Sequence, residues 1–273
     1  MRKVALAVAL LAALGFAATR LGGRDGAPSI ANLATPALTK KPLRVLFLGN
    51  SFIYVNNLPE MIRHLAEAGD DTLRFEAAQE CPGGQTFEGH WQSGAAERVL
   101  KQGHWDWVVL QEQSQRPSFT RHQLEDEMYP FARKLHQSIK AVGARPLFFL
   151  SWARRNGDRD NVPNDSFAAM QERLRTGYET IARELKDPVA PIGLAWKTVR
   201  EAGGPELFGE DGVHPNVAGS YLAACVLYAM FYGHSPSGNG YTAGLDIATA
   251  RGLQDVAMRS VRDTLLIGTS TAR

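Results

Sequence analysis

The sequence predicts an α/β protein: a three-layer α/β/α sandwich built around a central parallel sheet. Short apolar runs alternate with helical patterns along most of the chain. The runs are rich in leucine and β-branched residues, and most of them are apolar on both faces. Such strands are typical of a parallel sheet that helices cover on both sides.

Each predicted element follows from its local pattern. Apolar runs bounded by turn residues predict strands, and apolar residues at three- and four-residue spacing predict helices. The expected strands cover 44–49, 73–78, 106–111 and 146–151, with a weaker one near 189–192; the expected helices cover 58–68, 93–101, 121–142 and 166–186, and a helix over 215–232 closes the chain. A chain of 273 residues with 44% hydrophobic content can bury one substantial core, so one folded domain over 43–273 is expected.

The N-terminus differs in kind from the rest of the chain. Two cations, Arg2 and Lys3, precede an uncharged apolar run from Val4 to Ala18, the pattern of an export signal. The run is shorter than the ~20 residues of a bilayer span, and no strong cleavage site follows it. Residues 1–23 are therefore predicted to be a signal peptide or an uncleaved membrane anchor, and the protein is expected to be exported to a periplasmic or extracellular location.

Composition indicates a linker, the state of the cysteines and which partners to exclude. The segment 24–42 is rich in Ala, Pro and Thr without periodicity, which predicts a flexible tether. Cys81 and Cys225 are the two cysteines of the chain, and free thiols are expected rather than a disulfide scaffold. A formal net charge of +2, with no basic run interleaved with aromatics, argues against nucleic acid as a partner. The sequence carries no signal for an oligomeric state.

Residues that could take part in catalysis or ligand binding follow the predicted strands. Ligands of open parallel sheets bind beyond the carboxyl ends of the strands. After the first four expected strands the sequence has Gly49-Asn50-Ser51, Gly83 and Gly84, Gln111 to Gln113, and Ser151 and Trp152; Asp211 and His214 precede the last expected helix. A serine becomes a nucleophile when a histidine takes its proton and a carboxylate orients that histidine. The bland alternative is that Ser51, or Asn57 a turn later, caps a helix.

Taken in order, these blocks resemble the SGNH, or GDSL-like, hydrolases. Gly49-Asn50-Ser51 matches the first block, Gly84-Gln85-Thr86 the second, and Asp211-Gly212-Val213-His214 the last, so the resemblance spans nearly everything after the tether. It implies a flavodoxin-like sandwich and a serine esterase with Ser51 as nucleophile, His214 as base and Asp211 as its orienting carboxylate. It also implies an oxyanion hole that includes the backbone N–H groups of Ser51 and Gly84.

The chain departs from the family pattern at two blocks. Asn50 stands where the family name has Asp, and Gln111-Glu112-Gln113-Ser114 replaces the Gly-x-Asn-Asp block. Spacing assigns Gln113 as the side-chain oxyanion donor, with Gln111 as the alternative because carbohydrate acetyl esterases of the superfamily carry Gln-Gly-Glu near this point. Glu112 is expected to be a buried supporting side chain, the alternative being a second acid. The run VVLQEQSQ resembles an uncharacterised bacterial subgroup of SGNH-like proteins.

Two tryptophans, Trp91 and Trp152, are candidates for lining a sugar-binding cleft. The other histidines show no metal-ligand spacing, so neither a metal nor a cofactor is expected. The resemblance favours hydrolysis of a short-chain, in particular acetyl, ester on a small molecule or glycan. Two alternatives are an O-acyltransferase that acts on a cell-envelope glycan and a non-catalytic glycan-binding module on the same fold.

Overall fold

The computed structural model describes residues 40–270, with side chains as far as Thr264. They form one sheet of five parallel strands in the order β2-β1-β3-β4-β5. The strands are β1 (Lys41–Leu48), β2 (Leu73–Glu80), β3 (Trp107–Leu110), β4 (Arg145–Phe149) and β5 (Val189–Ala190). The predicted export segment 1–23 and most of the predicted tether 24–42 lie outside the described residues.

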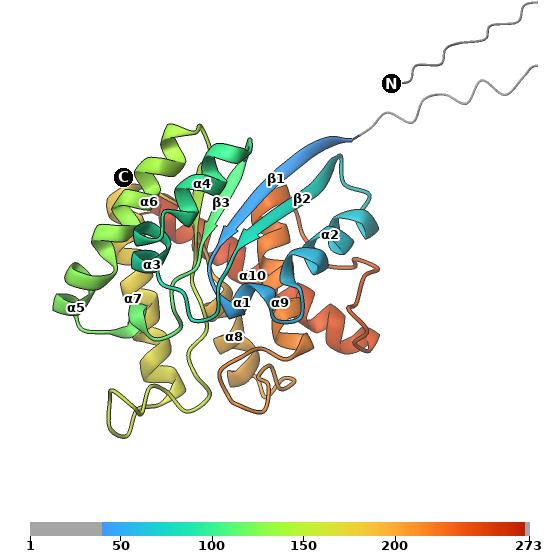
Figure 1. Ribbon diagram of the computed structural model, residues 1–273. Coiled ribbons are helices and arrows are strands. Elements are labelled where there is room, and N and C mark those ends of the chain that lie inside the picture. The colour runs from blue at the N-terminus through green and yellow to red at the C-terminus, as the bar shows by residue number, and fades with distance from the viewer. Residues whose placement is uncertain (1–39, 271–273) are drawn as a thin grey trace, which may run out of the picture. The chain divides into compact units, whose positions relative to one another are not determined.

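Helices cover both faces of this sheet (Figure 1). They are α1 (Ser51–Tyr54), α2 (Leu58–Ala68), α3 (Phe87–Gln92), α4 (Ala95–Gln102), the 3₁₀ turn η1 (Arg116–Ser118), α5 (Arg121–Glu127), α6 (Tyr129–Ala141), α7 (Phe167–Leu185), α8 (Ile192–Glu201), α9 (Val217–Tyr232) and α10 (Ile247–Ser270). The predicted three-layer sandwich with a parallel sheet is confirmed.

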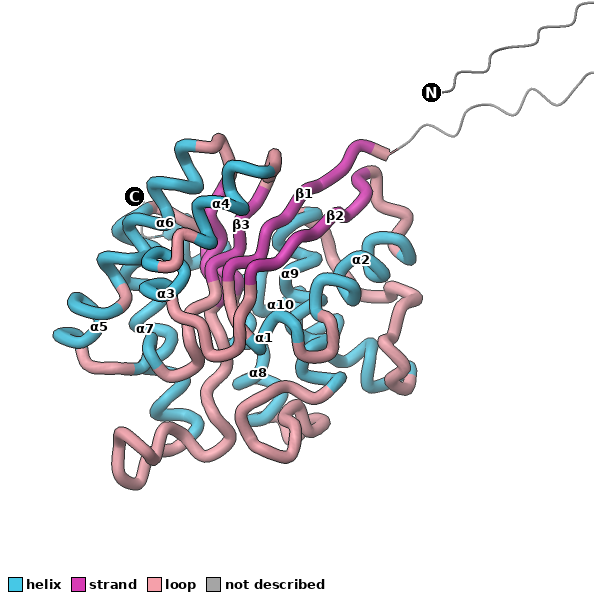
Figure 2. The backbone as a smooth tube through the Cα atoms, viewed as in Figure 1, coloured by secondary structure: helices cyan, strands magenta, loops and turns pink. Residues whose placement is uncertain are grey.

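The two cores explain why the strands are apolar on both sides. Val45 and Phe47 of β1 lie in a core shared with α2, α8, α9 and α10, whereas Leu46 and Leu48 lie in a core shared with α3 to α7. Successive residues of a strand face opposite sides of the sheet, so both sets must be apolar. In Figure 2 the strands end side by side near the middle of the molecule, and loops gather below these ends.

Two predicted elements need correction at their boundaries. The helix expected over 121–142 is two helices, because Pro130 lies at the start of α6, a position that tolerates proline, whereas a helix interior does not. The last strand ends at Ala190, and residue 192 already opens α8.

The predicted helix 215–232 corresponds to α9 but does not close the chain. Helix α10 follows and packs on α9, which accounts for an α9 that is buried nearly all round. None of the helices in the described part of the chain is long and apolar enough to cross a membrane.

Candidate active site

Ser51 opens α1 directly after β1, but it does not cap that helix. The N-cap is Asn50, whose Oδ1 accepts a 3.3 Å hydrogen bond from the backbone N–H of Phe52. Asn57, the residue before α2, makes no side-chain capping bond either. The capping alternative for Ser51 and Asn57 is therefore wrong, and the Ser51 hydroxyl is free to bond elsewhere.

Buried side chains hold the backbone of the Ser51 turn. The Gln111 Oε1 accepts a 2.9 Å hydrogen bond from the N–H of Asn50, and His90 Nε2 donates to the carbonyl of Gly49 at 2.9 Å. A Cβ on Gly49 would lie 2.7 Å from that Gln111 oxygen, so only glycine fits before the turn. Burial lowers the pKa of His90, which keeps its imidazole neutral beside the carbonyl.

Three predicted side chains from distant parts of the chain meet at this turn. Ser51 Oγ lies 2.8 Å from His214 Nε2, and His214 Nδ1 lies 2.6 Å from Asp211 Oδ2. The histidine and the carboxylate come from the loop between α8 and α9. In such a chain of hydrogen bonds the imidazole can take the serine proton while the carboxylate stabilises the resulting cation.

Several donors hold Asp211 as a carboxylate. Its Oδ1 accepts 2.9 Å hydrogen bonds from the backbone N–H groups of Val213 and His214. Burial by itself would raise the pKa of Asp211, but the hydrogen bonds from the His214 side chain and from both N–H groups outweigh it and lower the pKa from its ordinary value. A charged Asp211 favours the imidazole tautomer with its proton on Nδ1.

Trp152 supports this loop instead of lining a cleft, which corrects the sequence prediction. Its side chain is 1% exposed, and its ring stacks between Phe52 at 4.3 Å and Trp196 at 4.2 Å between centroids. Its indole Nε1–H donates to the carbonyl of Val213 at 3.0 Å. The tryptophan therefore links α1 and α8 to the loop that carries His214, and it leaves no face for a sugar.

The backbone N–H groups of Ser51 and Gly84, at the sheet edge, have no acceptor among residues 40–270. Gly84 has φ +67, a conformation that favours glycine, and a Cβ there would meet nothing within 4 Å. The Asn50 Nδ2 donates to the carbonyl of Gln85 at 3.0 Å and so ties this loop to the Ser51 turn. Free N–H groups of this kind can stabilise a developing oxyanion.

The two candidate glutamines differ in what they bond. The Gln111 amide is fully buried and engaged at both ends, since its Oε1 accepts from Asn50 and its Nε2 donates to the carbonyl of Glu112. Gln113 Oε1 accepts from the N–H groups of Gln115 and Arg116 at 2.8 and 3.2 Å, and its Nε2 has one long contact of 3.3 Å to Gln115 Oε1. Gln111 thus supports the backbone of the Ser51 turn, which corrects its prediction as the alternative oxyanion donor. The Nε2 of Gln113 makes only one long hydrogen bond.

Glu112 is fully buried behind these loops, as expected for a supporting side chain. Its two carboxyl oxygens accept from the N–H groups of Phe87 at 3.1 Å and Gln113 at 2.6 Å, and they thereby join the start of α3 to the loop after β3. Burial raises its pKa to about 7, although these hydrogen bonds oppose the shift.

The Glu112 pKa predicts a pH-dependent stability. A carboxyl with a folded pKa of about 7, above its ordinary 4.5, binds its proton more tightly in the folded state, so its contribution weakens as pH rises between these values. Between pH 5 and 8 we expect the free energy of unfolding to fall by about 2 kcal/mol through this group. Denaturant titrations should show this fall in the wild type and in Asp126→Asn, an exposed control, but not in Glu112→Gln. An identical pH slope in Glu112→Gln would refute the assignment.

Trp91 and Cys81 take no part in the hydrogen-bonded chain. Trp91, the other predicted sugar-binding residue, packs against the core around α6, with Lys134 Nζ 5.5 Å from its ring centroid. Burial raises the pKa of the Cys81 thiol to about 12, which disfavours a thiolate nucleophile. Both cysteines are free, as predicted.

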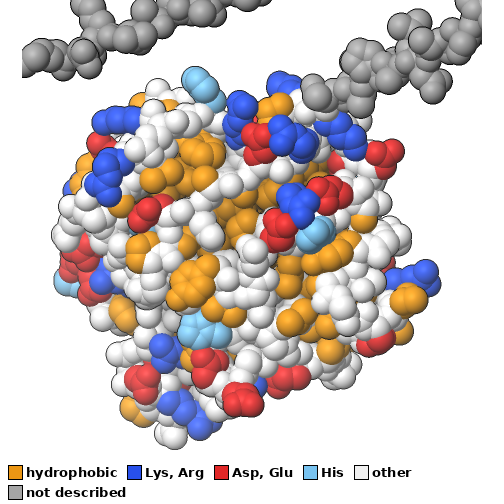
Figure 3. Space-filling view, turned by 45° about the vertical axis from the view of Figure 1, so that its right-hand side comes forward, with side chains coloured by type: hydrophobic (Ala, Val, Ile, Leu, Met, Phe, Trp, Pro, Cys, Tyr) orange, Lys and Arg blue, Asp and Glu red, His pale blue; other side chains and the backbone are white. Residues whose placement is uncertain are grey.

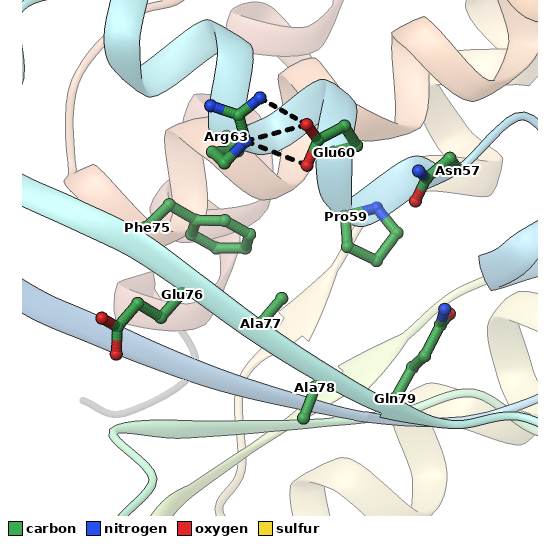
Figure 4. A pocket seen from close by; sticks show the side chains of 9 residues that line it. All are labelled: Asn57, Pro59, Glu60, Arg63, Phe75, Glu76, Ala77, Ala78 and Gln79. Atoms are coloured by element: carbon green, nitrogen blue, oxygen red, sulfur yellow. Dashed lines mark hydrogen bonds and ion pairs between the residues drawn. The ribbon is translucent and has the colours of Figure 1, made fainter.

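An open groove of about 350 Å³ lies between α2 and β2 and contains none of the predicted site residues (Figure 4). Ala77 and Ala78 line it from the strand, opposite the ion pair of Glu60 with Arg63. Figure 3 shows hydrophobic side chains across the middle of one face, with a small group of charged side chains and a histidine among them and other charged side chains nearer the rim. Within residues 40–270 no group of three or more His, Cys, Asp or Glu side chains could hold a metal ion.

The fold defines the class of protein. No protein-family model and no curated protein matches the chain. Solved structures do match it, and SGNH and GDSL-like hydrolases are among them. The α/β fold is that of the SGNH hydrolases, so the resemblance predicted from the sequence is confirmed at the level of the fold.

Three of these structures illustrate the likeness. "A putative SGNH hydrolase" from Slackia heliotrinireducens is 28% identical, with a TM-score of 0.56 over 69% of this chain and 98% of its own. A DUF4886 family protein from Bacteroides uniformis is 17% identical, with a TM-score of 0.70 over 81% and 95%. Axe2, an acetylxylan esterase from Geobacillus stearothermophilus, is 18% identical, with a TM-score of 0.55 over 72% and 96%.

Proposed function

We propose that this protein is a serine esterase that hydrolyses short-chain carboxylic esters. The observation that carries the proposal is the continuous chain of hydrogen bonds from Ser51 through His214 to Asp211, at the edge of the sheet where parallel α/β proteins bind ligands. The fold shared with SGNH hydrolases supports it.

The reaction follows from this geometry. Ser51 Oγ attacks the ester carbonyl carbon while His214 Nε2 takes its proton, and Asp211 stabilises the imidazolium. The N–H groups of Ser51 and Gly84 stabilise the oxyanion, with Gln113 Nε2 as a third donor. His214 then protonates the leaving alkoxide, and a water activated by the same imidazole cleaves the acyl-enzyme and releases the carboxylic acid.

An acetyl ester on a carbohydrate is the proposed substrate. Axe2 is described as an acetylxylan esterase, and the predicted export of this chain suits a substrate outside the cytoplasm. An O-acyltransferase would use the same side chains but should transfer its acyl group to an added sugar acceptor and hydrolyse poorly without one. A non-catalytic glycan-binding module would bind acetylated glycans without turnover, and the Ser51–His214–Asp211 chain argues against it.

Hydrolysis of a panel of p-nitrophenyl esters and acetylated oligosaccharides tests the function directly. We expect turnover that is fastest with acetyl esters, and covalent labelling by a fluorophosphonate at Ser51. Labelling at another residue, or transfer that requires an acceptor, would contradict a hydrolase that uses Ser51.

The third oxyanion donor is tested separately. If Gln113 Nε2 bonds the oxyanion, Gln113→Ala should lower kcat by about 10²–10³ with little change in KM, because the bond strengthens as charge develops. Gln111→Ala should instead lower Tm, since it leaves the buried N–H of Asn50 without its acceptor. Unchanged kcat in Gln113→Ala would remove this residue from the oxyanion hole.

Export is proposed on the sequence alone. We expect the mature protein to lack roughly the first 20 residues. Mass spectrometry of protein recovered from the native envelope identifies its N-terminus. Recovery of a peptide that includes Met1 or Arg2 from the membrane fraction would favour an uncleaved anchor.

A further inference from the structure

A second groove lies beside the loop that carries Asp211 and His214. It has a volume of about 360 Å³ and is formed by the loop after β4, the first turn of α7 and the last turn of α8. These segments lie at the lower end of the molecule in Figure 1, beyond the carboxyl ends of the strands. Three arginines, Arg155, Arg159 and Arg200, line the groove.

The positive charge of this groove is only partly neutralised. Within the described residues Arg159 and Arg200 form no ion pair with a carboxylate, and the Arg159 Nε donates only to the backbone carbonyl of Asp165 at 3.3 Å. Arg155 lies 3.6 Å from Glu206. Glu201, the one acidic residue of the described chain that lines the groove, lies 3.7 Å from Lys197. A groove with this excess of guanidinium groups attracts an anion.

Aromatic rings hold two of the guanidinium groups in place. The Cζ of Arg200 lies 4.4 Å from the ring centroid of Phe167 and 5.1 Å from that of Phe208, and the Cζ of Arg155 lies 5.4 Å from the Phe208 centroid. Stacking leaves the planar edge of a guanidinium available for a bidentate contact with a carboxylate or phosphate. The groove is thus ordered before a ligand arrives, which lowers the entropic cost of binding.

Arg155 connects the groove to the proposed catalytic loop. Its backbone N–H donates to the carbonyl of Gly212, and its side-chain Nη2 donates to the carbonyl of Gly209, both at 2.8 Å. Phe208, on which it stacks, forms a backbone bridge with Pro215, the residue after His214. The groove therefore adjoins the loop that carries Asp211 and His214.

We infer that this groove binds an anionic group, a carboxylate or a phosphate, carried by the saccharide whose ester group reacts at Ser51. The inference rests on the proposed esterase function and narrows its substrate class to acidic saccharides. Arg155 also supports the loop, so Arg159 and Arg200 are the residues to substitute.

Direct binding tests the groove without relying on turnover. Isothermal calorimetry on the full chain compares oligogalacturonate, a neutral xylooligosaccharide and inorganic phosphate as ligands. Oligogalacturonate should bind the wild type more tightly than the neutral oligosaccharide and should weaken with added salt. The double variant Arg159→Gln/Arg200→Gln should lose about ten- to hundredfold in affinity. The double variant Arg251→Gln/Arg259→Gln, at two exposed arginines of α10 and with the same charge change, should not.

The outcomes of these measurements distinguish a carboxylate ligand from a phosphate ligand. They also distinguish failure of the groove inference from failure of the esterase proposal. Loss of oligogalacturonate binding in the double variant supports a carboxylate-bearing saccharide, and loss of phosphate binding alone supports a phosphate-bearing one. Equal affinity for both oligosaccharides with no effect of the arginines overturns the inference. Hydrolysis of p-nitrophenyl acetate by the wild type tests the esterase proposal independently. If the protein binds the anion but does not hydrolyse this ester, the esterase proposal is refuted while anion binding by the groove still holds.

Discussion

Replacing Ser51 with alanine is expected to lower ester hydrolysis by about 10⁴–10⁶-fold and to leave the melting temperature nearly unchanged. The loss of turnover follows because Oγ is the proposed nucleophile, 2.8 Å from the base that takes its proton. The small effect on stability follows because Asn50, and not Ser51, caps α1. His214→Ala should show a similar loss of kcat, since the serine and the histidine act as a unit.

A true capping residue provides the matched control. Thr120 caps α5, where its side chain accepts from the N–H of Gln123, so Thr120→Ala should cost about 1 kcal/mol of stability while hydrolysis of p-nitrophenyl acetate continues. Calorimetric Tm values and kcat with p-nitrophenyl acetate give the comparison. Hydrolysis by Ser51→Ala at the wild-type rate would overturn the mechanism.

Asp211→Asn is expected to lower kcat by about 10⁴-fold without unfolding the loop. The asparagine oxygen can still accept from the backbone N–H groups of Val213 and His214, as Oδ1 of Asp211 does. Its NH₂ group would then face His214 Nδ1 and force the imidazole proton onto Nε2. In this tautomer Nε2 has no lone pair with which to take the proton of Ser51.

The pH dependence of stability provides a second measurement on the same variant. The folded pKa of Asp211 is lowered, so its contribution to stability is present above its ordinary value of 3.8 and is lost as pH falls through the lower folded pKa. Asp211→Asn should therefore lose less stability than the wild type on acidification through that range.

For catalysis, a kcat of Asp211→Asn within tenfold of the wild type would show that Asp211 does not set the tautomer of His214.

The sequence alone predicted the layers, the strand positions within a few residues and the three residues that form the hydrogen-bonded chain. The layers and strands follow from local patterns, because apolar runs without polar alternation require a sheet covered on both faces. The three residues were predicted from the order of sequence blocks that resembles the SGNH hydrolases. The sequence did not predict α8 as a helix or α10 as a second partner for α9. The outer surface of α9 needs a cover, but its composition does not say which segment provides it.

Only the tertiary structure decided what the side chains around that edge do. Trp152 and Trp91 have the composition of a sugar cleft, yet Trp152 is buried between two aromatic rings and Trp91 lies beside Lys134. Gln111 and Gln113 are two residues apart, yet one braces the Ser51 turn and the other keeps a weakly bonded amide. Residue type and order along the chain determined which chemistry was available, whereas burial and hydrogen-bond partners depend on segments 60 or more residues away and arise only when the chain folds.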